Sequence, residues 1–367
     1  IYYHAVDFFK GALLAGILNI NLAAIEQNYS KLHRGDPSSV AAVVKANAYG
    51  LGIEPISKRL WAVGCKEFFV AEVSEGVTLR TILPAARIYV LEGFSRDQIE
   101  IVVKNDLIPV LNTPEQCRQW IEIGESAVVH LDTGMERLGL SIEEFVEMSS
   151  SNRLKIEMLM SHFARADEPD HPFNQTQINR LSDAHRLIKE RFPFARISLN
   201  NSAACLAGMS EFSDCETLVR GGIALYGGSP FRTSEKGDGL ATVASLSARV
   251  IQIRRVKAGA GLGYGSTFSV DQNSDIAIVG LGYADGLPRS LSNKGHCTIN
   301  GKRFSIRGTI SMDTFHLDVS DAEVSVGDVV QIFGGAPTLR EVADHAGTID
   351  YEILTGLGQR LERVYFD

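Results

Sequence analysis

Cysteine is scarce in this chain and follows no pattern. The five cysteines, Cys65, Cys117, Cys205, Cys215 and Cys297, are odd in number and include no C-x-x-C pair. A framework of disulfides is therefore not expected, and a reduced, cytoplasmic compartment is the simplest interpretation. No cluster of cysteine and histidine has the spacing of zinc ligands, so we also expect no metal site.

Runs of like charge and long apolar runs are missing as well. The net charge of −8 argues against a nucleic-acid partner, and no segment is long and apolar enough to span a membrane. The apolar stretch from Phe8 to Leu18 contains Lys10, and the chain starts at Ile1 rather than Met, so we interpret this start as truncated rather than as a signal peptide. The length favours two domains, or one large barrel with an appendage.

Short apolar runs alternate with helix-like segments from about residue 40 to residue 222. The predicted strands cover residues 41–45, 68–73, 88–92, 108–112, 127–132, 156–162, 197–200 and 217–220. Amphipathic stretches such as 95–104 and 175–191 lie between them. Alternating βα units imply a parallel sheet, and eight of them predict a (β/α)8 barrel of the TIM type, with a doubly wound open sheet as the alternative.

The pattern becomes mostly β after about residue 239. Predicted strands cover 243–256, 275–282, 297–300, 302–306 and 329–333, and a capping-box pattern begins a helix at Thr338. We therefore predict a barrel domain at 13–238 and a C-terminal β domain at 239–367. An alternating segment near 16–22 is expected to pair outside the barrel, with the β domain.

Lys45 ends the first predicted barrel strand, among apolar neighbours. The C-terminal ends of barrel strands are where TIM barrels carry their chemistry. Loss of hydration lowers the pKa of a lysine, and a neutral amine can form a Schiff base with an aldehyde. A lysine reaching from a strand end to solvent is the alternative.

The loops after the seventh and eighth predicted strands favour the functional interpretation. Barrels often bind phosphate there. The segment 200–204 offers amide and hydroxyl groups, and the segment 220–223 offers the backbone amides of two glycines. Together with Lys45, these loops suggest a phosphorylated carbonyl cofactor.

Several motifs in order resemble those of the alanine racemase family. The segment 42–50 (AVVKANAYG) is similar to its pyridoxal-phosphate attachment motif, and 131–139 (LDTGMERLG) is similar to its arginine-bearing loop. The segments 161–164 (SHFA), 201–203 (NSA) and 220–227 (RGGIALYG) follow within the barrel. In the β domain the matches are 263–265 (GYG), 282–286 (GYADG), 311–313 (SMD) and 351–352 (YE).

The resemblance implies an isomerase that interconverts L-alanine and D-alanine by two-base proton transfer. Lys45 would hold pyridoxal 5'-phosphate and act as one base, and Tyr264 from the partner subunit would be the other, on the opposite face. Arg220 would meet the pyridine nitrogen and leave it unprotonated, which makes the ring a weaker electron sink and suppresses transamination. The functional unit would be a homodimer with composite sites.

The resemblance also implies the remaining site residues. Those that would bind the cofactor are Tyr49, Arg137, His162, Asn201, Ser202, Gly222, Ile223 and Tyr351. Those that would meet the substrate are Arg137, Met312, Tyr264 and Tyr283. Supply of D-alanine as a peptidoglycan precursor for the cell wall and its breakdown are both consistent with these motifs.

One position departs from the family pattern. Well-studied members carry a carbamate-modified lysine two residues before the aspartate of the arginine-bearing loop, and here that residue is His130. A histidine cannot carry a stable carbamate. Our hypothesis is that His130, or a bound anion such as chloride, orients Arg137 instead.

Three alternatives stay open. A pyridoxal-phosphate decarboxylase of basic amino acids on the same scaffold is disfavoured by Arg220 and Tyr264. A non-enzymatic pyridoxal-phosphate carrier of the small barrel type is disfavoured by the β domain. A racemase for serine, or one of broader specificity, is compatible with the motifs.

Overall fold

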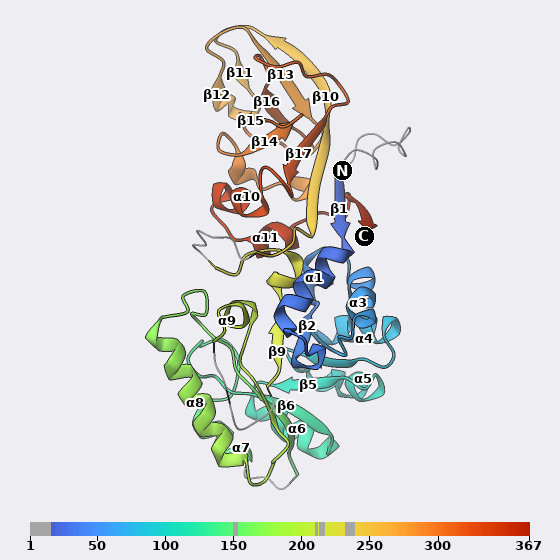
Figure 1. Ribbon diagram of the computed structural model, residues 1–367, viewed down its shortest axis with the longest axis vertical. Coiled ribbons are helices and arrows are strands. Elements are labelled where there is room, and N and C mark those ends of the chain that lie inside the picture. The colour runs from blue at the N-terminus through green and yellow to red at the C-terminus, as the bar shows by residue number, and fades with distance from the viewer. Residues whose placement is uncertain (1–15, 150–152, 210–211, 213–216, 232–238) are drawn as a thin grey trace. The chain divides into compact units, whose positions relative to one another are not determined.

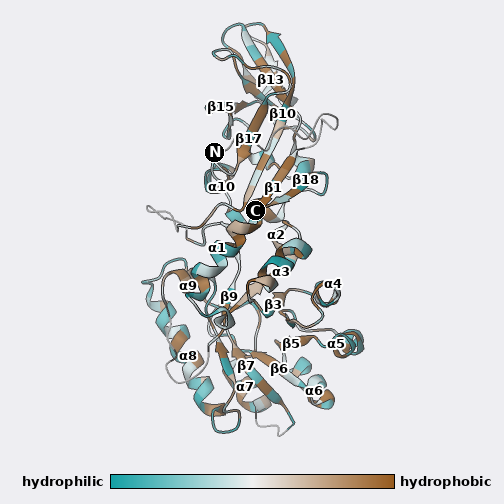
Figure 2. Cartoon of the chain, turned by 45° about the vertical axis from the view of Figure 1, so that its right-hand side comes forward, coloured by the Kyte–Doolittle hydropathy of each residue, from teal (hydrophilic) through white to brown (hydrophobic). Residues whose placement is uncertain are grey.

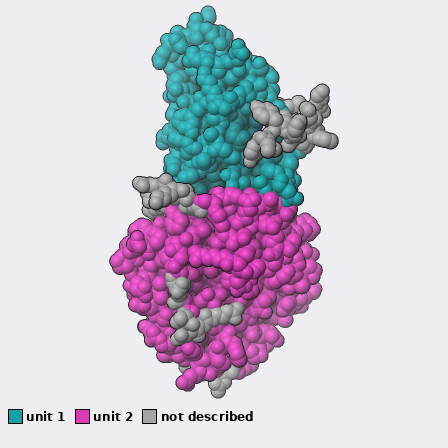
Figure 3. Space-filling model, viewed as in Figure 1, with its two compact units in different colours: residues 1–21, 242–367 teal, residues 22–241 magenta. Residues whose placement is uncertain are grey.

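The computed structural model describes residues 16–149, 153–209, 212, 217–231 and 239–367. The chain divides into two compact units, one of residues 22–241 and one that joins residues up to 21 to 242–367 (Figure 3). The expected domain edges at 13 and 238, and most of the apolar stretch from Phe8, fall outside the described residues. No described helix is both long and apolar enough to cross a membrane.

The unit of residues 22–241 is built on a parallel sheet (Figure 1). Its strands are β2 (Val40–Val43), β3 (Glu67–Val70), β4 (Arg87–Val90), β5 (Ile108–Leu111), β6 (Ser126–His130), β7 (Lys155–Met160), β8 (Arg196–Ser198) and β9 (Val219–Gly221). They pair in the order β8-β7-β6-β5-β4-β3-β2-β9. A bridge between Ile197 and Thr217 joins β8 to the segment before β9, where Leu218 N donates to Ile197 O at 2.8 Å. The sheet therefore closes into the expected barrel, and the open-sheet alternative is wrong.

Helices alternate with these strands along the chain. They are α1 (Leu22–His33), α3 (Ile53–Ala62), α4 (Val73–Ile82), α5 (Ile99–Lys104), α6 (Pro114–Ile123), α7 (Ile142–Ser149), α8 (Pro172–Ile188) and α9 (Ser202–Leu206), with short 3-10 turns η1 (Pro37–Ser39), η2 (Arg96–Gln98) and η3 (Ile223–Tyr226). Figure 2 shows apolar strands, and helices that are apolar on one side and polar on the other. Local signals set their ends: Thr113 accepts from Gln116 N at the start of α6, and Pro114 occupies the first helical position.

The other unit is mostly strand. Its large sheet contains β1 (Ile17–Asn21), β10 (Ala244–Val256), β13 (Ser274–Val279), β14 (His296–Ile299), β15 (Lys302–Arg307), β16 (Phe315–Asp318), β17 (Val329–Phe333) and β18 (Glu362–Phe366). The order is β13-β16-β15-β14-β17-β10-β1-β18, with β13 also paired to β10. β1 pairs antiparallel with β10 and parallel with β18.

Smaller elements complete this unit. They are the hairpin of β11 (Gly261–Leu262) and β12 (Phe268–Ser269), the helices α10 (Leu339–Ala346) and α11 (Asp350–Thr355), and the 3-10 turns η4 (Tyr264–Ser266), η5 (Tyr283–Asp285) and η6 (Arg289–Leu291). The expected turn at Asn300-Gly301 joins β14 to β15 with φ of 50° and 77°. The Thr338 capping box also forms, because Glu341 N donates to Thr338 Oγ1 at 3.1 Å. β16 and β18 were not expected from the sequence.

Candidate active site

Lys45 follows β2 at the C-terminal end of the barrel and begins α2 (Lys45–Tyr49). The next residues, Ala46 to Tyr49, have φ between 52° and 55°, so α2 is a left-handed turn. A left-handed turn costs about 1–2 kcal/mol for each L-residue, so surrounding contacts must stabilise it. Two side chains make such contacts: Glu75 Oε1 accepts from Ala46 N at 2.5 Å, and Asn47 Oδ1 accepts from Ile53 N at 2.8 Å.

The surroundings of Lys45 favour its neutral form. Burial lowers the pKa of its amine, and the positive charges of Arg137 and Arg220 lower it further, against the carboxylates of Glu75 and Glu92. A neutral amine has a free electron pair, so Lys45 can act as a nucleophile or as a base.

Arg220 lies on β9 with only 4% of its surface exposed. Its guanidinium donates to the carbonyl oxygens of Ser198 (2.8 Å) and Ser161 (2.7 Å), to the Ser198 hydroxyl (2.6 Å) and to His162 Nδ1 (2.9 Å). Burial, and then the charge of Arg137, lower the pKa of Arg220 to about 9. Arg220 therefore remains a cation at neutral pH, and none of these four partners is a carboxylate.

His162 follows β7 and is neutral. Its Nδ1 accepts from Arg220, so its proton is on Nε2, and burial followed by the charges of Arg220 and Arg137 holds its pKa well below the usual range. Gln177 on α8 holds the loop after β7 that contains His162. Its Nε2 donates to His162 O at 2.9 Å and to Thr133 Oγ1 at 3.0 Å. One buried glutamine thus joins the loops that follow β6 and β7.

His130 is the last residue of β6, and its Nδ1 lies 2.7 Å from Asn112 Oδ1. The Asn112 amide nitrogen donates to Leu91 O and Val110 O, each at 2.9 Å, so its oxygen must face His130 as an acceptor. Nδ1 of His130 is therefore the protonated nitrogen. Burial, then the charges of Arg220 and Arg137, lower the pKa of His130 to about 3. The histidine is neutral, and its hydrogen bond is to Asn112 rather than Arg137.

Arg137 lies in the exposed loop after β6. The loop is wound around Asp132, whose Oδ1 accepts from Gly134 N at 2.8 Å and from Met135 N at 2.9 Å. Although burial alone would raise the pKa of Asp132, these backbone donors lower it. Within the described residues the Arg137 guanidinium forms no hydrogen bond, while its charge acts on Lys45, His162 and Arg220.

Tyr49, Ser202 and Gly222 meet at the same end of the barrel. The Tyr49 hydroxyl lies 2.6 Å from the point where a Cβ on residue 222 would stand, so any larger residue there would have to displace the tyrosine hydroxyl. Ser202 Oγ accepts from Gly222 N at 2.9 Å, which leaves its own hydrogen to donate. Two hydroxyls beside an uncrowded backbone form a cradle suited to an anion such as phosphate.

Two other residues of the expected phosphate loops have local roles. Asn201 caps α9, since its Oδ1 accepts from Ala204 N at 3.0 Å, and buried Ile223 begins η3.

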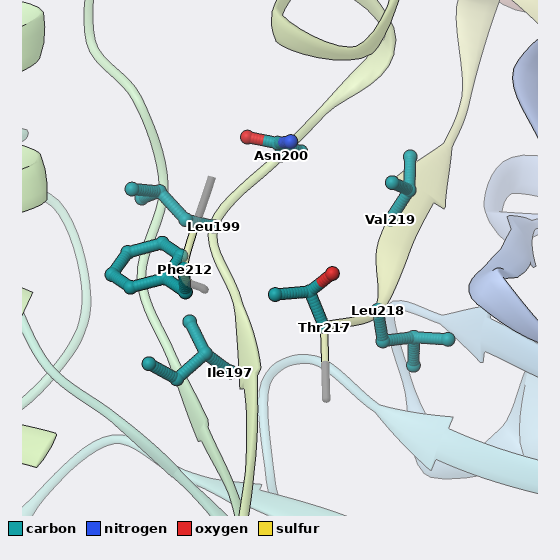
Figure 4. Close-up of a pocket in the computed structure, with 7 residues that line it drawn as sticks. All are labelled: Ile197, Leu199, Asn200, Phe212, Thr217, Leu218 and Val219. Carbon is teal, nitrogen blue, oxygen red and sulfur yellow. The ribbon is translucent and has the colours of Figure 1, made fainter. Parts of the chain in front are cut away.

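A small pocket between the chain segments of β8 and β9 is lined by Ile197, Leu199, Asn200, Phe212, Thr217, Leu218 and Val219 (Figure 4). This lining has no charged side chain and includes none of the candidate residues, so the pocket is separate from the candidate site.

The remaining candidates, Tyr264, Tyr283, Met312 and Tyr351, belong to the mostly β unit. Tyr264 in η4 is 75% exposed, Met312 is 52% exposed and Tyr283 in η5 is 43% exposed. Backbone hydrogen bonds join the segment of Tyr283 to the segment of Met312: Tyr283 N donates to Ser311 O, and Ala284 N donates to Met312 O. Tyr351 is half-buried on α11. The structure thus divides the candidates between two units. Within the barrel it brings Arg137, His162 and Arg220 close enough to Lys45 to interact with its charge, and it brings Tyr49, Ser202 and Gly222 together.

Glu75, Asn112 and Gln177 support the site and were missed from the sequence. Gln177 and Arg180 are three residues apart on α8, and Arg180 Nη1 donates to Thr133 O at 2.8 Å. This spacing places both on one helix face, which is a signal the sequence contains. Nothing in the sequence near Glu75 or Asn112 indicates which loop each would reach.

Comparisons with known proteins agree with this architecture. Residues 20–230 match the family model described as alanine racemase, N-terminal domain, and 243–365 match alanine racemase, C-terminal domain. The chain is 42% identical over 366 residues to "Alanine racemase, catabolic" from Agrobacterium fabrum, covering 96% of this chain and 92% of the relative. It is 39% identical to "Alanine racemase" from Brucella abortus, covering 95% and 93%.

Solved structures give the same result. A Bartonella henselae alanine racemase "with covalently bound pyridoxal phosphate" superposes with a TM-score of 0.88 at 34% identity, over 96% of this chain and 99% of that one. One from Bacillus anthracis "with bound L-Ala-P" has a TM-score of 0.84 at 29% identity, over 98% and 96%. The matches span both domains, which disfavours the barrel-only carrier, and the family models and relatives are those of alanine racemases, which disfavours the decarboxylase. The expected resemblance is confirmed: the chain belongs to the alanine racemase family, and it is an enzyme of the isomerase class.

Proposed function

We propose that this enzyme interconverts L-alanine and D-alanine, with pyridoxal phosphate held at Lys45 and the partner subunit's Tyr264 completing the site. The relatives above are alanine racemases by name, which supports alanine as the substrate. The observation that carries the proposal is Arg220, a buried cation without a carboxylate partner among its hydrogen bonds, beside a lysine whose pKa is lowered.

The residues at the C-terminal end of the barrel fit this cofactor. The hydroxyls of Tyr49 and Ser202 converge where a Cβ on Gly222 would stand, which suits a phosphate group. Arg220 would meet the pyridine nitrogen. Because an arginine cannot accept a proton, the nitrogen would stay unprotonated, which favours proton transfer over transamination. Asn201 at the start of α9, Ile223 in η3 and Tyr351 on α11 would add to phosphate binding.

Two bases are needed on opposite faces of the substrate. When bound, pyridoxal phosphate withdraws electrons from Cα of the amino acid and so acidifies its Cα–H bond. Lys45 would take the proton from one face, and burial, which lowers the pKa of its amine, favours the neutral form that a base needs. Tyr264 would deliver a proton to the other face, and its exposure on its own unit leaves the hydroxyl accessible to a second subunit.

Substrate recognition would combine charge and shape. The charge of Arg137, whose guanidinium forms no hydrogen bond within the described part of the chain, would attract the substrate carboxylate. The partner subunit's Met312 would meet the same carboxylate through its backbone, and Tyr283 would line the access route. His162, neutral and fixed by Arg220, would extend the hydrogen-bond network around the ring.

This arrangement requires a symmetric homodimer. Each barrel would receive Tyr264 and Met312 from the other subunit, so activity should depend on association. The check is the specific activity on serial dilution, followed alongside the mass of the particle by light scattering. Full specific activity at concentrations where only monomer remains would contradict the composite site.

Proton exchange tests the reaction itself. The holoenzyme is incubated with L-alanine or D-alanine in deuterated water, and Cα exchange and the opposite enantiomer are followed by NMR and chiral chromatography. Wild-type enzyme should exchange and interconvert both. Tyr264→Phe should stop interconversion, yet one enantiomer should still exchange its proton through Lys45.

Three results would overturn the proposal. Exchange with serine or lysine but not alanine would reassign the substrate. Absence of exchange, with the cofactor's visible absorption present, would favour a carrier. Equal loss of exchange for both enantiomers in Tyr264→Phe, with cofactor still bound, would remove the two-base assignment.

A further inference from the structure

Tyr264 lies at the tip of the β11–β12 hairpin, and the hairpin is firmly packed only at its base. Leu262 and Val270 are buried there with Ile276 of β13. Beyond this cluster, residues 263 to 267 are exposed. A base that must meet Cα at a defined distance and angle therefore stands on a segment with few apolar contacts.

A group of three polar residues fixes the far side of the hairpin, and we name Asn293, Thr267 and Thr309 the threonine clasp. Thr267 Oγ1 lies 3.0 Å from Thr309 Oγ1, and Asn293 Nδ2 donates to Thr267 Oγ1 at 3.2 Å. Asn293 Oδ1 accepts from Gly308 N at 2.6 Å, which ties the asparagine to the same neighbouring segment as Thr309.

The backbone beside Tyr264 is shaped for this contact. Gly263 has φ of 66°, and a Cβ there would stand 3.0 Å from Thr309 O. Thr309 precedes the turn that contains Ser311 and Met312, and Ser311 O accepts from Tyr283 N. The clasp thus connects the Tyr264 hairpin to the segment that holds Met312 and Tyr283.

We propose that the threonine clasp is a positioning device for Tyr264, which sets where its hydroxyl stands relative to the Met312 segment. This inference rests on the proposed two-base function. Each hydrogen bond of the clasp is partly or fully exposed, so it contributes little to folding stability. A misplacement of about 1 Å, however, can slow a reaction by up to about 10²-fold. The clasp should therefore affect the Tyr264 face of the reaction far more than the folding of the chain.

The experiment measures Cα exchange of each enantiomer separately, with the holoenzyme in deuterated water. Tyr264→Phe defines the two faces: the enantiomer that still exchanges reports on Lys45, and the other reports on Tyr264. Thr267→Val keeps the shape and removes the shared hydroxyl. Asn293→Gly keeps the left-handed backbone (φ 60° at Asn293) and removes the amide.

Two further variants separate positioning from stability. Thr267→Ser restores the hydroxyl and should recover the wild-type rate. Thr338→Val removes the cap of α10 in the same unit, which destabilises the unit without touching the clasp. Thermal unfolding of every variant is measured alongside the exchange rates.

We expect Thr267→Val and Asn293→Gly to slow exchange at the Tyr264 face by roughly tenfold or more. In both clasp variants, exchange at the Lys45 face should stay within about twofold of the wild-type rate. In the control Thr338→Val, exchange at both faces should stay within the same limit. Equal slowing at both faces, or no slowing in either clasp variant, would overturn the inference while leaving the proposed function intact. If Tyr264→Phe fails to separate the two faces, the proposed function fails and the clasp inference fails with it.

Discussion

At the N-terminal ends of the barrel strands arginines face carboxylates, whereas at the C-terminal ends they face carbonyls and neutral rings. Arg196, the first residue of β8, forms two bonds of 2.7 Å to the Glu67 carboxylate on β3. Arg87 on β4 bonds Glu157 at 2.6 Å, and Tyr89 donates to Glu67 at 2.6 Å. Positive charge at this end is matched by negative charge from the chain.

At the C-terminal end of the barrel strands, buried Arg220 has no carboxylate among its hydrogen-bond partners. Arg220 bonds two carbonyls, a hydroxyl and a histidine. His130 and His162 are held neutral by burial and by the neighbouring arginines. Since buried charge is unfavourable unless it is balanced, the unmatched Arg220 supports the proposal that this end of the barrel binds a phosphorylated cofactor and a substrate carboxylate.

The largest effect should follow from Lys45→Ala. The variant removes the amine that we assign as cofactor anchor and as base, so racemisation should fall by at least about 10³-fold. The visible absorption of bound pyridoxal phosphate should be lost as well. Activity and spectrum are measured with and without added methylamine. Retention of half of the wild-type rate would show that Lys45 is neither the cofactor anchor nor the base.

Arg220→Glu should make the C-terminal end of the barrel resemble its N-terminal end, because it places a carboxylate there. A carboxylate facing the pyridine nitrogen would share a proton with it and strengthen the electron sink. Racemisation should fall by roughly 10²–10³-fold, as when a fixed electrostatic partner is removed. Pyruvate formation from alanine should rise, and coupled lactate dehydrogenase detects it. Arg196→Glu at the other end is the matched control, which should unfold at lower temperature without producing pyruvate.

Glu67→Gln tests the N-terminal end of the barrel strands by itself. Removing the charge leaves Arg196 half-paired in a mostly buried setting, so the free energy of unfolding should fall by about 2–3 kcal/mol, with kcat unchanged in the folded enzyme. Burial alone would raise the pKa of Glu67, but Arg196 and Tyr89 lower it. The stabilisation is therefore present above the ordinary glutamate pKa and is lost as pH falls through the lowered value. Urea unfolding at pH 7 and pH 3 should show a wild-type advantage at pH 7 that shrinks at pH 3.

Sequence reasoning recovered the barrel because its strands are continuous apolar runs and its helices are amphipathic, signals that are local. It missed β16 and β18 because these strands lack such local signals. Phe315–Asp318 and Glu362–Phe366 are short, half polar and stabilised by pairing with distant strands. Strand pairing of this kind depends on partners that no local window contains.

The residues of the candidate site also fall into those with a local sequence signal and those without one. Lys45, Arg220 and Gly222 stand in motifs at strand ends, so the sequence could indicate them. Glu75 supports the turn after Lys45 from another loop, and Asn112 fixes His130 from the neighbouring strand end. Their roles follow from which loops the closed barrel brings together, and that information is absent from either segment alone.

The smallest effect should come from His130→Asp, which adds one carboxylate to the C-terminal end. The charges of Arg220 and Arg137, which act on residue 130, would favour the charged form of the new carboxylate, whereas the Asn112 oxygen, which can only accept, would oppose it. That charge should raise the pKa of Lys45, and the pH optimum of racemisation should move upward. A shift of about one pH unit corresponds to roughly tenfold lower activity at neutral pH. His130→Asn is the neutral control, and it should keep the wild-type pH profile. The comparison is made by measuring kcat/KM from pH 6 to pH 10. An identical profile for His130→Asp and His130→Asn would mean that charge at this position does not reach Lys45, and that the neutrality of His130 serves packing alone.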